Sequence, residues 1–434
     1  PITLPWADGS PRGLTLAQTP FLVRRVSVAH SSELGGPANA ITLTLEAVTA
    51  GEPGATAPVA TNQVSQPGWT PPGTLFPESG LPTTPPGQLS GVVNDLALFS
   101  AGAARYFVTG DFRSASPTYT ERDLAALGMV GTLVAAVQNA FNLDQVWVVT
   151  QTHIGRVDGV FGAPSYSQQF TFRTSTPRRS LQTERGFENF VVVSSYYSDG
   201  VWVTWTTDGV NWVPEVQVTP NAQAAGQLPG IHVSPRVYGK VITSAVAGGI
   251  GQIHVDDDLI SGASFAPVSG TSSFRGLAGE IHVPYHDNPN EDIFYYGWYD
   301  VTTVVSNIRL YRHQNGISTE VSPLQTSLGV GPAIDGITKK IHTCDLNRRL
   351  VLACLYRWDT QRGVWTSTDG GDTWTERVGL SLTTPWAGGH VSSDQQTLYL
   401  WGAGIAVSPD FGATITDKSG DLPSNFGVSN IFGR

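Results

Sequence analysis

The chain has 434 residues, of which 40% are hydrophobic and only 14% are charged, and its formal net charge is −10. This length suits one large domain with a smaller one, or a single repeat array. An acidic chain without a basic stripe is a poor ligand for phosphate backbones, so we expect no nucleic-acid partner. No apolar run is long enough to span a bilayer, so we expect no membrane insertion. The 48 Gly, 29 Pro and 12 Trp favour many short strands joined by tight turns.

The first 88 residues differ from the rest. Residues 1–50 hold two apolar stretches, 21–28 and 40–45, and the second alternates as a half-buried strand does. They predict a small β arm or attachment module. Residues 51–88 are dominated by Gly, Pro, Thr and Ser, a composition that cannot bury a core and predicts a linker or a surface loop.

A repeat begins near residue 89 and continues to residue 434. Its unit is a short apolar strand that often carries His, a polar turn, and then a second apolar strand. The histidines of four such units are His232, His282, His342 and His390. The repeat length of about 35–60 residues is that of propeller blades, in which four antiparallel strands form one blade. We therefore predict an all-β fold, a β-propeller of about seven four-stranded blades over residues 89–434. The segment 293–298 is apolar at every position, as expected for a strand between two neighbouring blades.

One segment breaks this pattern. Residues 120–123 could cap a helix that runs to about residue 139, because Leu124, Leu127, Val134 and Val137 have roughly helical spacing. We predict a short helical insertion over about 120–140, although two glycines weaken it.

The most specific motif is Ser-x-Asp-x-Gly-x-Thr-Trp at residues 367–374. Two partial copies follow the same order of residue types. The residues of the three motifs are Ser367, Asp369, Gly371 and Trp374, then Asp208, Gly209 and Trp212, then Asp410 and Gly412. The pattern resembles the Asp box, or BNR repeat, of sialidases, sortilin-like receptors and xyloglucan-active glycoside hydrolases, and the resemblance implies a propeller. Its role is structural, since Asp accepts backbone N–H bonds in a hairpin turn, Gly adopts a backbone conformation closed to other residues, and the aromatic ring packs beneath.

Metal and cofactor sites are not predicted. The four repeat histidines could approach a central channel, but propeller strands splay too widely to bring three of them within about 2.1 Å of one ion. We expect histidines hydrogen-bonded within their blades. Cys344 and Cys354 flank a hairpin turn near residues 347–348 and are offset along it, so we expect two core thiols without a disulfide.

Ligand contacts are expected in the loops. Trp386 and Tyr166 are the aromatic candidates, and Asp287, Glu291 and Asp292 form an acidic loop that could contribute. A glycosidase needs two carboxylates about 5–10 Å apart, and no such pair can be assigned. The nearest match to a sialidase segment, residues 21–25, departs from the family pattern. No catalytic residue is therefore predicted, and the chain is expected to be non-enzymatic.

Three functions stay open. An N-terminal arm, a Pro/Gly-rich connector and a terminal propeller resemble the organisation of bacteriophage tail or other virion proteins. That resemblance implies a structural or receptor-binding virion component whose arm binds other virion proteins and whose propeller meets a host-surface glycan or protein. The alternatives are a glycoside hydrolase acting on surface glycans, sialidase-like or xyloglucanase-like, and a cellular assembly-factor or receptor propeller. Pro1, without an apolar segment after it, predicts synthesis in the cytoplasm with loss of the initiator Met alone, and hence a virion location. A processed precursor, or an extracellular protein, is the alternative.

Overall fold

The fold was analysed in a computed structural model of the whole chain. The residues that the structure describes are 2–3, 21–29, 40–47, 89, 91–139, 142–173, 178–183, 190–220, 230–234, 237–247, 250–271, 280–282, 293–300, 307–321, 339–344, 349–354, 363–377, 386–392, 394 and 396–434. The chain divides into two compact units, residues 1–67 and residues 68–434.

The first unit contains a three-stranded antiparallel sheet. Its strands are β1 (Ile2–Thr3), β2 (Phe21–Ala29) and β3 (Ala40–Ala47), in the spatial order β1-β3-β2. The register places Val26 opposite Leu43 and Val28 opposite Ile41.

In the second unit, the described strands form seven four-stranded antiparallel sheets. Six of them consist of four consecutive strands. The first three of these are β7 (Leu133–Gln138), β8 (Gln145–Thr150), β9 (His153–Asp158) and β10 (Ser165–Thr171); β11 (Arg178–Thr183), β12 (Val191–Tyr197), β13 (Gly200–Thr206) and β14 (Val216–Pro220); and β15 (Ile231–Val233), β16 (Val241–Ala247), β17 (Ile250–Asp256) and β18 (Ala266–Pro267).

The next three sheets follow in chain order. They are β19 (Glu280–His282), β20 (Ile293–Asp300), β21 (Asn307–Gln314) and β22 (Ile317–Glu320); β23 (Lys339–Cys344), β24 (Arg349–Cys354), β25 (Gly363–Ser367) and β26 (Thr375–Glu376); and β27 (Trp386–Val391), β28 (Leu398–Gly402), β29 (Ile405–Ser408) and β30 (Thr416–Asp417). The remaining sheet joins the last strand, β31 (Asn430–Gly433), to β4 (Leu96–Phe99), β5 (Arg105–Thr109) and β6 (Thr120–Asp123).

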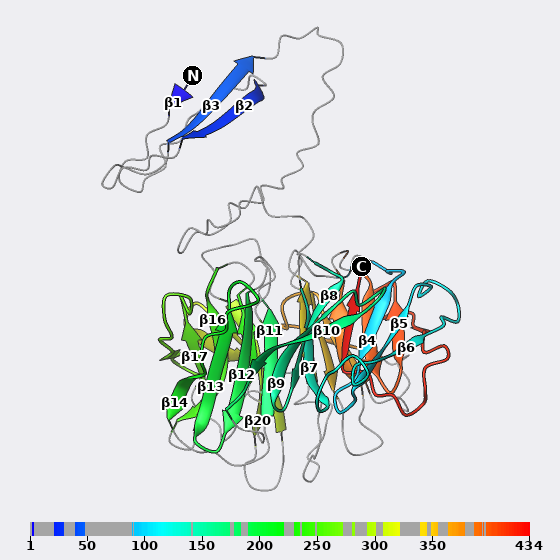
Figure 1. The fold of residues 1–434 in the computed structure, drawn as a ribbon. Coiled ribbons are helices and arrows are strands. Elements are labelled where there is room, and N and C mark those ends of the chain that lie inside the picture. The colour runs from blue at the N-terminus through cyan, green and yellow to red at the C-terminus, as the bar shows by residue number, and fades with distance from the viewer. Residues whose placement is uncertain are drawn as a thin grey trace. The chain divides into compact units, whose positions relative to one another are not determined.

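The sheets are arranged around a ring as propeller blades. Contacts run from β31 to β7, from β7 to β11, and on through β15, β19, β23 and β27, so the first strand of each sheet lies innermost. Figure 1 shows β4 to β6 beside the red C-terminal strand, and the green sheets of β7 to β17 following around the unit. The all-β propeller class is therefore confirmed.

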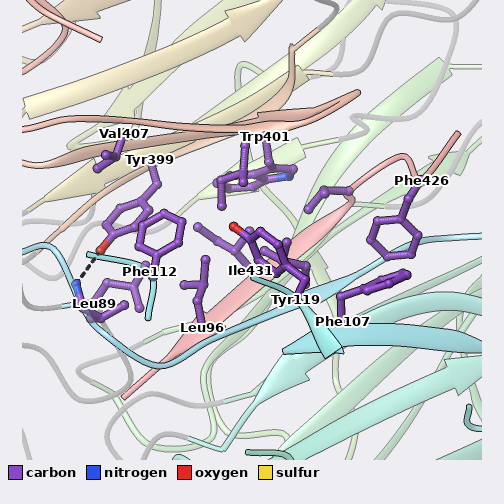
Figure 2. Close-up of a cluster of buried hydrophobic side chains, with 14 residues drawn as sticks. Leu89, Leu96, Phe107, Phe112, Tyr119, Tyr399, Trp401, Val407, Phe426 and Ile431 are labelled. Carbon is purple, nitrogen blue, oxygen red and sulfur yellow. Dashed lines mark hydrogen bonds between the residues drawn. The ribbon is translucent and has the colours of Figure 1, made fainter. Parts of the chain in front are cut away.

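The ring is closed by strands from the two ends of the unit. Residues of β31 pair with β4, with Phe432 opposite Ala97. A buried cluster then packs this composite sheet against β28 and β29, and Figure 2 shows Leu96 across from Tyr399 and Trp401, with Phe107 against Phe426. The hydroxyl of Tyr399 accepts a bond from the N–H of Val93, 3.0 Å away, which Figure 2 also draws.

Several middle strands are buried on both faces, because each sheet is covered by its two neighbours. All seven residues of β12 and all six of β8 are buried. In β20, the side chains of Ile293, Phe294, Tyr295 and Tyr296 are each at most 3% exposed. The continuous apolar run that predicted an inter-blade strand at 293–298 therefore lies in such a strand.

The predicted helical insertion over 120–140 is wrong. Residues 120–123 form the outer strand β6, and residues 133–138 form the inner strand β7 of the next sheet. The carboxylate of Asp123 does cap a turn, accepting the N–H groups of Ala125 and Ala126. Gly128, at φ +101°, ends that turn at once, because a helix cannot continue through a left-handed residue. No helix occurs in the part of the chain that the structure describes.

The two cysteines lie on the neighbouring strands β23 and β24, as predicted. The register places Cys344 opposite Arg349 and Cys354 opposite Lys339, at the two ends of the ladder. Strand partners at opposite ends of a six-residue ladder are too far apart for a disulfide.

Candidate binding pocket

Aspartate turns recur at one end of the propeller. The three predicted motifs follow β13, β25 and β29, each the third strand of its sheet. Because successive strands of a sheet are antiparallel, the turn after the first strand lies at the same end as the turn after the third. This end, called here the aspartate-turn end, therefore carries both kinds of turn.

The turn at Asp369 is held by its own side chains. The hydroxyl of Ser367 donates to Oδ1 of Asp369 (2.7 Å) and accepts the N–H of Gly371 (2.8 Å), and Oδ1 also accepts the N–H of Thr373 (2.9 Å). Gly371 has φ +94°, a left-handed conformation that favours glycine. Burial raises the pKa of Asp369, but the bonds from Thr373 and Ser367 outweigh it and hold that pKa at about 2. Trp374 donates its indole N–H to the carbonyl of Val321 (2.8 Å), which ties the turn to the preceding sheet.

The other two motifs share this arrangement. Oδ1 of Asp208 accepts the N–H groups of Val210 and Asn211, and these bonds, led by that from Asn211, lower its pKa. Bonds from the N–H and hydroxyl of Thr414 hold the pKa of Asp410 at about 2. The left-handed glycines of these turns are Gly209 (φ +72°) and Gly412 (φ +91°). The ring of Trp212 packs edge-on against Trp147 of the neighbouring sheet, 5.9 Å between centres.

Sequence reasoning missed two related turns. After β5, Asp111 accepts a bond from the hydroxyl of Thr109 and another from the N–H of Thr118, seven residues later. After β27, Asp394 accepts bonds from both the N–H and the hydroxyl of Thr397. The Asp111 turn does not match the motif, because an insertion places its closing threonine, Thr118, seven residues after the aspartate instead of four. The signal that could have found it is a Ser/Thr-x-Asp triplet at the end of an apolar strand.

A polar pocket of about 370 Å³ lies beside the Asp111 turn. This volume falls in the range of small-molecule sites, about 300–1,000 Å³. It is called here the inter-sheet pocket, and its lining residues are Asp95, Val108, Thr109, Gly110, Asp111, Thr118, Thr120, Arg122 and Phe161. All but Phe161 come from the composite sheet of β31 and β4–β6, and Phe161 comes from the turn between β9 and β10 of the next sheet. The pocket therefore opens between two sheets, at the aspartate-turn end.

Both carboxylates of the pocket are already engaged. Asp111 holds the turn through Thr109 and Thr118, and these bonds lower its pKa. Oδ2 of Asp95 accepts a bond from Nε of Arg434 at 2.7 Å. The lowered pKa of Asp111 does not suit a general acid, which must carry a proton near neutral pH. The lining of the pocket thus combines hydroxyl, carboxylate and guanidinium groups.

Two arginines border the pocket. Nη2 of Arg122 donates to the carbonyl of Gly162 in the neighbouring sheet (3.2 Å). Its Nε has no hydrogen-bond partner within the part of the chain that is described. The guanidinium of Arg434 stacks 4.9 Å from the ring centre of Phe161, while its salt bridge holds Asp95. The cations thus fix two walls of the pocket relative to each other.

The predicted ligand residues are not gathered at this pocket. Tyr166 lies in the outer strand β10, half-buried against Gly155, where an added Cβ would collide with its ring. Trp386 begins β27, opposite Gly402. The acidic loop of Asp287, Glu291 and Asp292 lies outside the described residues. No described contact joins these candidates, so each remains a separate prediction.

The repeat histidines lie on the inner strands β15, β19, β23 and β27. Nδ1 of buried His232 is 2.8 Å from the carbonyl oxygen of Val233, a bond within its own sheet, as expected. Among the residues that the structure describes, no three His, Cys, Asp or Glu side chains are grouped so as to hold a metal ion. The same residues include no helix that is long and apolar enough to cross a membrane.

The solved structures whose folds resemble that of this chain include β-propellers. The GH74 xyloglucanase of Xanthomonas campestris is 13% identical, with a TM-score of 0.49, over 77% of this chain and 56% of that one. The GH74 enzyme of Niastella koreensis is also 13% identical (TM-score 0.48; 77% and 55% coverage). A functionally unknown protein of Desulfotomaculum acetoxidans is 10% identical (TM-score 0.49; 78% and 99%). The alignments thus span little more than half of each GH74 enzyme. No protein-family model and no curated protein matches the sequence.

Proposed function

We propose that this chain is a non-enzymatic binding propeller whose ligand contacts lie at the aspartate-turn end. The observation that carries the proposal is the inter-sheet pocket, whose two carboxylates, Asp95 and Asp111, are committed to Arg434 and to the Asp111 turn. A polar pocket in which Asp95 is paired with Arg434 and the pKa of Asp111 is lowered suits recognition better than hydrolysis.

We further propose that the aspartate turns are Asp boxes and that the propeller belongs to a virion, where it contacts a host-surface glycan or protein or a neighbouring virion protein. The shared bonds of Asp208, Asp369 and Asp410 support the first part. A separate N-terminal unit supports the second, because it provides a module through which the propeller can attach to a particle.

One pair of measurements tests the central proposal. The full chain is assayed for binding to immobilised glycans and to host-surface proteins, and in parallel for turnover of polysaccharides and aryl glycosides. We expect saturable binding without turnover. Turnover that is abolished by substitution of a single carboxylate would establish a glycoside hydrolase and overturn the proposal.

The virion assignment has its own test. The chain's mass in its native source, measured after gentle lysis, should match a large particle that contains capsid or tail proteins. A free monomer in that source would refute this part and leave the binding function intact.

A further inference from the structure

The inter-sheet pocket offers both hydrogen-bond donors and hydrogen-bond acceptors, and its net charge is small. Its hydroxyls come from Thr109, Thr118 and Thr120; the first two donate to Asp111, and Thr120 can both donate and accept. The carboxylates of Asp95 and Asp111 accept, and the guanidinium of Arg122 donates. With the bordering Arg434, the formal charges of these four ionised groups cancel.

This balance selects among ligands. A sialic acid or another anionic sugar would have to place its carboxylate close to Asp95 and Asp111 in a chain whose net charge is −10. A cationic ligand would find both carboxylates already paired or hydrogen-bonded. The hydroxyl groups of a neutral sugar both donate and accept, as the lining does, and Phe161 adds an apolar surface for the ring.

One hydroxyl of the lining is free to bind a ligand, and a guanidinium lies on the same face. The hydroxyl of Thr120 lies in β6 opposite Val108, on the pocket side, and it has no side-chain hydrogen bond among the described residues. Arg122, two residues further on and therefore on the same face, lines the pocket as well, and its Nη2 is held by the carbonyl of Gly162. Glu121, between them, points to the opposite face and pairs with Arg105 at 3.2 Å.

We infer that the inter-sheet pocket is a subsite for a neutral, hydroxyl-rich sugar, read by Thr120 and Arg122. This inference rests on the proposed binding function and names the ligand class of its pocket.

The test uses the full chain on an array that pairs each neutral glycan with its sialylated form. We expect binding to neutral members and weaker binding to their sialylated partners. Thr120→Val replaces the hydroxyl with a methyl group of similar size and should weaken neutral binding by about three- to tenfold. Thr120→Ser restores the hydroxyl and should bind as the parent does. Arg122→Met should weaken binding at least as much, while the matched control Glu121→Gln, on the other face of the same strand, should leave it unchanged.

The outcomes separate the inference from the proposed function. Preference for sialylated glycans, or neutral binding that Thr120→Val leaves intact in a protein with an unchanged melting temperature, would overturn the inference alone. Binding to a host-surface protein with no glycan binding would also overturn the inference and keep the binding function. Absence of any binding together with glycoside turnover would overturn the proposed function itself.

Discussion

The guanidinium of Arg173 lies 3.7 Å from the ring centre of Trp202, a residue of the neighbouring sheet. Arg173 follows β10, and Trp202 belongs to β13, so this cation–π contact spans two blades. Arg173 also bonds to Asp199 (2.9 Å), whose carboxylate accepts the indole N–H of Trp202 (3.1 Å). The contact therefore joins consecutive blades at the end of the propeller opposite the aspartate turns.

The first prediction concerns this contact. Arg173→Ala should lower the free energy of unfolding by about 1 kcal/mol, because it removes a cation–π contact and a partly exposed ion pair. Arg173→Lys should recover only part of the loss, since an ammonium group cannot stack as a planar guanidinium does. Urea denaturation measures both. Equal stability of the alanine variant and the parent would mean that solvent replaces the contact at no cost.

The second prediction concerns the Asp369 turn. Asp369→Ala should destabilise the chain by about 1 kcal/mol, as loss of a comparable capping side chain does, because the N–H of Thr373 loses its acceptor. Thr368→Ala, at an exposed position of the same turn, is the matched control and should be neutral. Thermal denaturation of the two variants measures the change in stability. An unchanged melting temperature for Asp369→Ala would contradict the structural role of the turn.

The same turn predicts acid sensitivity. The folded-state pKa of Asp369, about 2, lies below its ordinary value of 3.8. The stabilisation is therefore fully present above about pH 4 and is lost as the pH falls towards 2. In Asp369→Ala, the fall in stability over this pH range should be shallower than in the parent. A parallel fall in both proteins would show that other carboxyl groups account for it.

A third prediction concerns His254 in β17, which is 4% exposed and has no hydrogen-bond partner for either ring nitrogen among the described residues. Burial lowers the pKa of His254 from 6.5 to about 4. The unfolded chain therefore binds a proton at this residue at a higher pH than the folded chain does. This contribution to stability is complete above about pH 7 and should fall by about 3 kcal/mol as the pH drops to 4.

Replacement of this histidine isolates its contribution. His254→Leu should flatten the dependence of the unfolding free energy on pH between 6.5 and 4, measured by urea denaturation at several pH values. His153→Leu, at a half-buried histidine of β9, serves as the comparison. If the slope in His254→Leu equals that of the parent, proton uptake by His254 does not limit stability in acid.

The fourth prediction concerns ring closure. The hydroxyl of Tyr399 donates to the carbonyl of Gly91 (2.7 Å) and accepts the N–H of Val93 (3.0 Å), which links β28 to the segment before β4. Tyr399→Phe should cost about 1–3 kcal/mol, because it leaves buried backbone groups unsatisfied. Tyr166→Phe removes a hydroxyl from a half-buried tyrosine without a described hydrogen bond at its oxygen, and should cost far less. Similar losses in the two variants would argue against a special role for the closure bonds.

Much of the fold followed from local patterns. Apolar runs such as residues 293–296 predicted strands covered on both faces, and the motif at 367–374 predicted a hairpin held by Asp369. These features depend on residues close in the chain, so the sequence shows them directly. The helix predicted over 120–140 failed because its apolar spacing also suits a strand, a turn and a second strand. Partners from β5 and β8 decided between the two.

The candidate pocket could not be predicted in the same way. Arg122 and Phe161 are 39 positions apart, and Arg434 meets Asp95 only because the last strand pairs with β4. Nothing in the local sequence marks Thr120 as a ligand contact, since threonine in an outer strand is ordinary.

By itself the sequence determined the strands, their turns and the repeat, since these rest on short-range sterics and alternation. The tertiary structure alone decided which polar side chains would face one another across two sheets, because packing of neighbouring sheets brings Arg122 to Phe161 and closure of the ring brings Arg434 to Asp95.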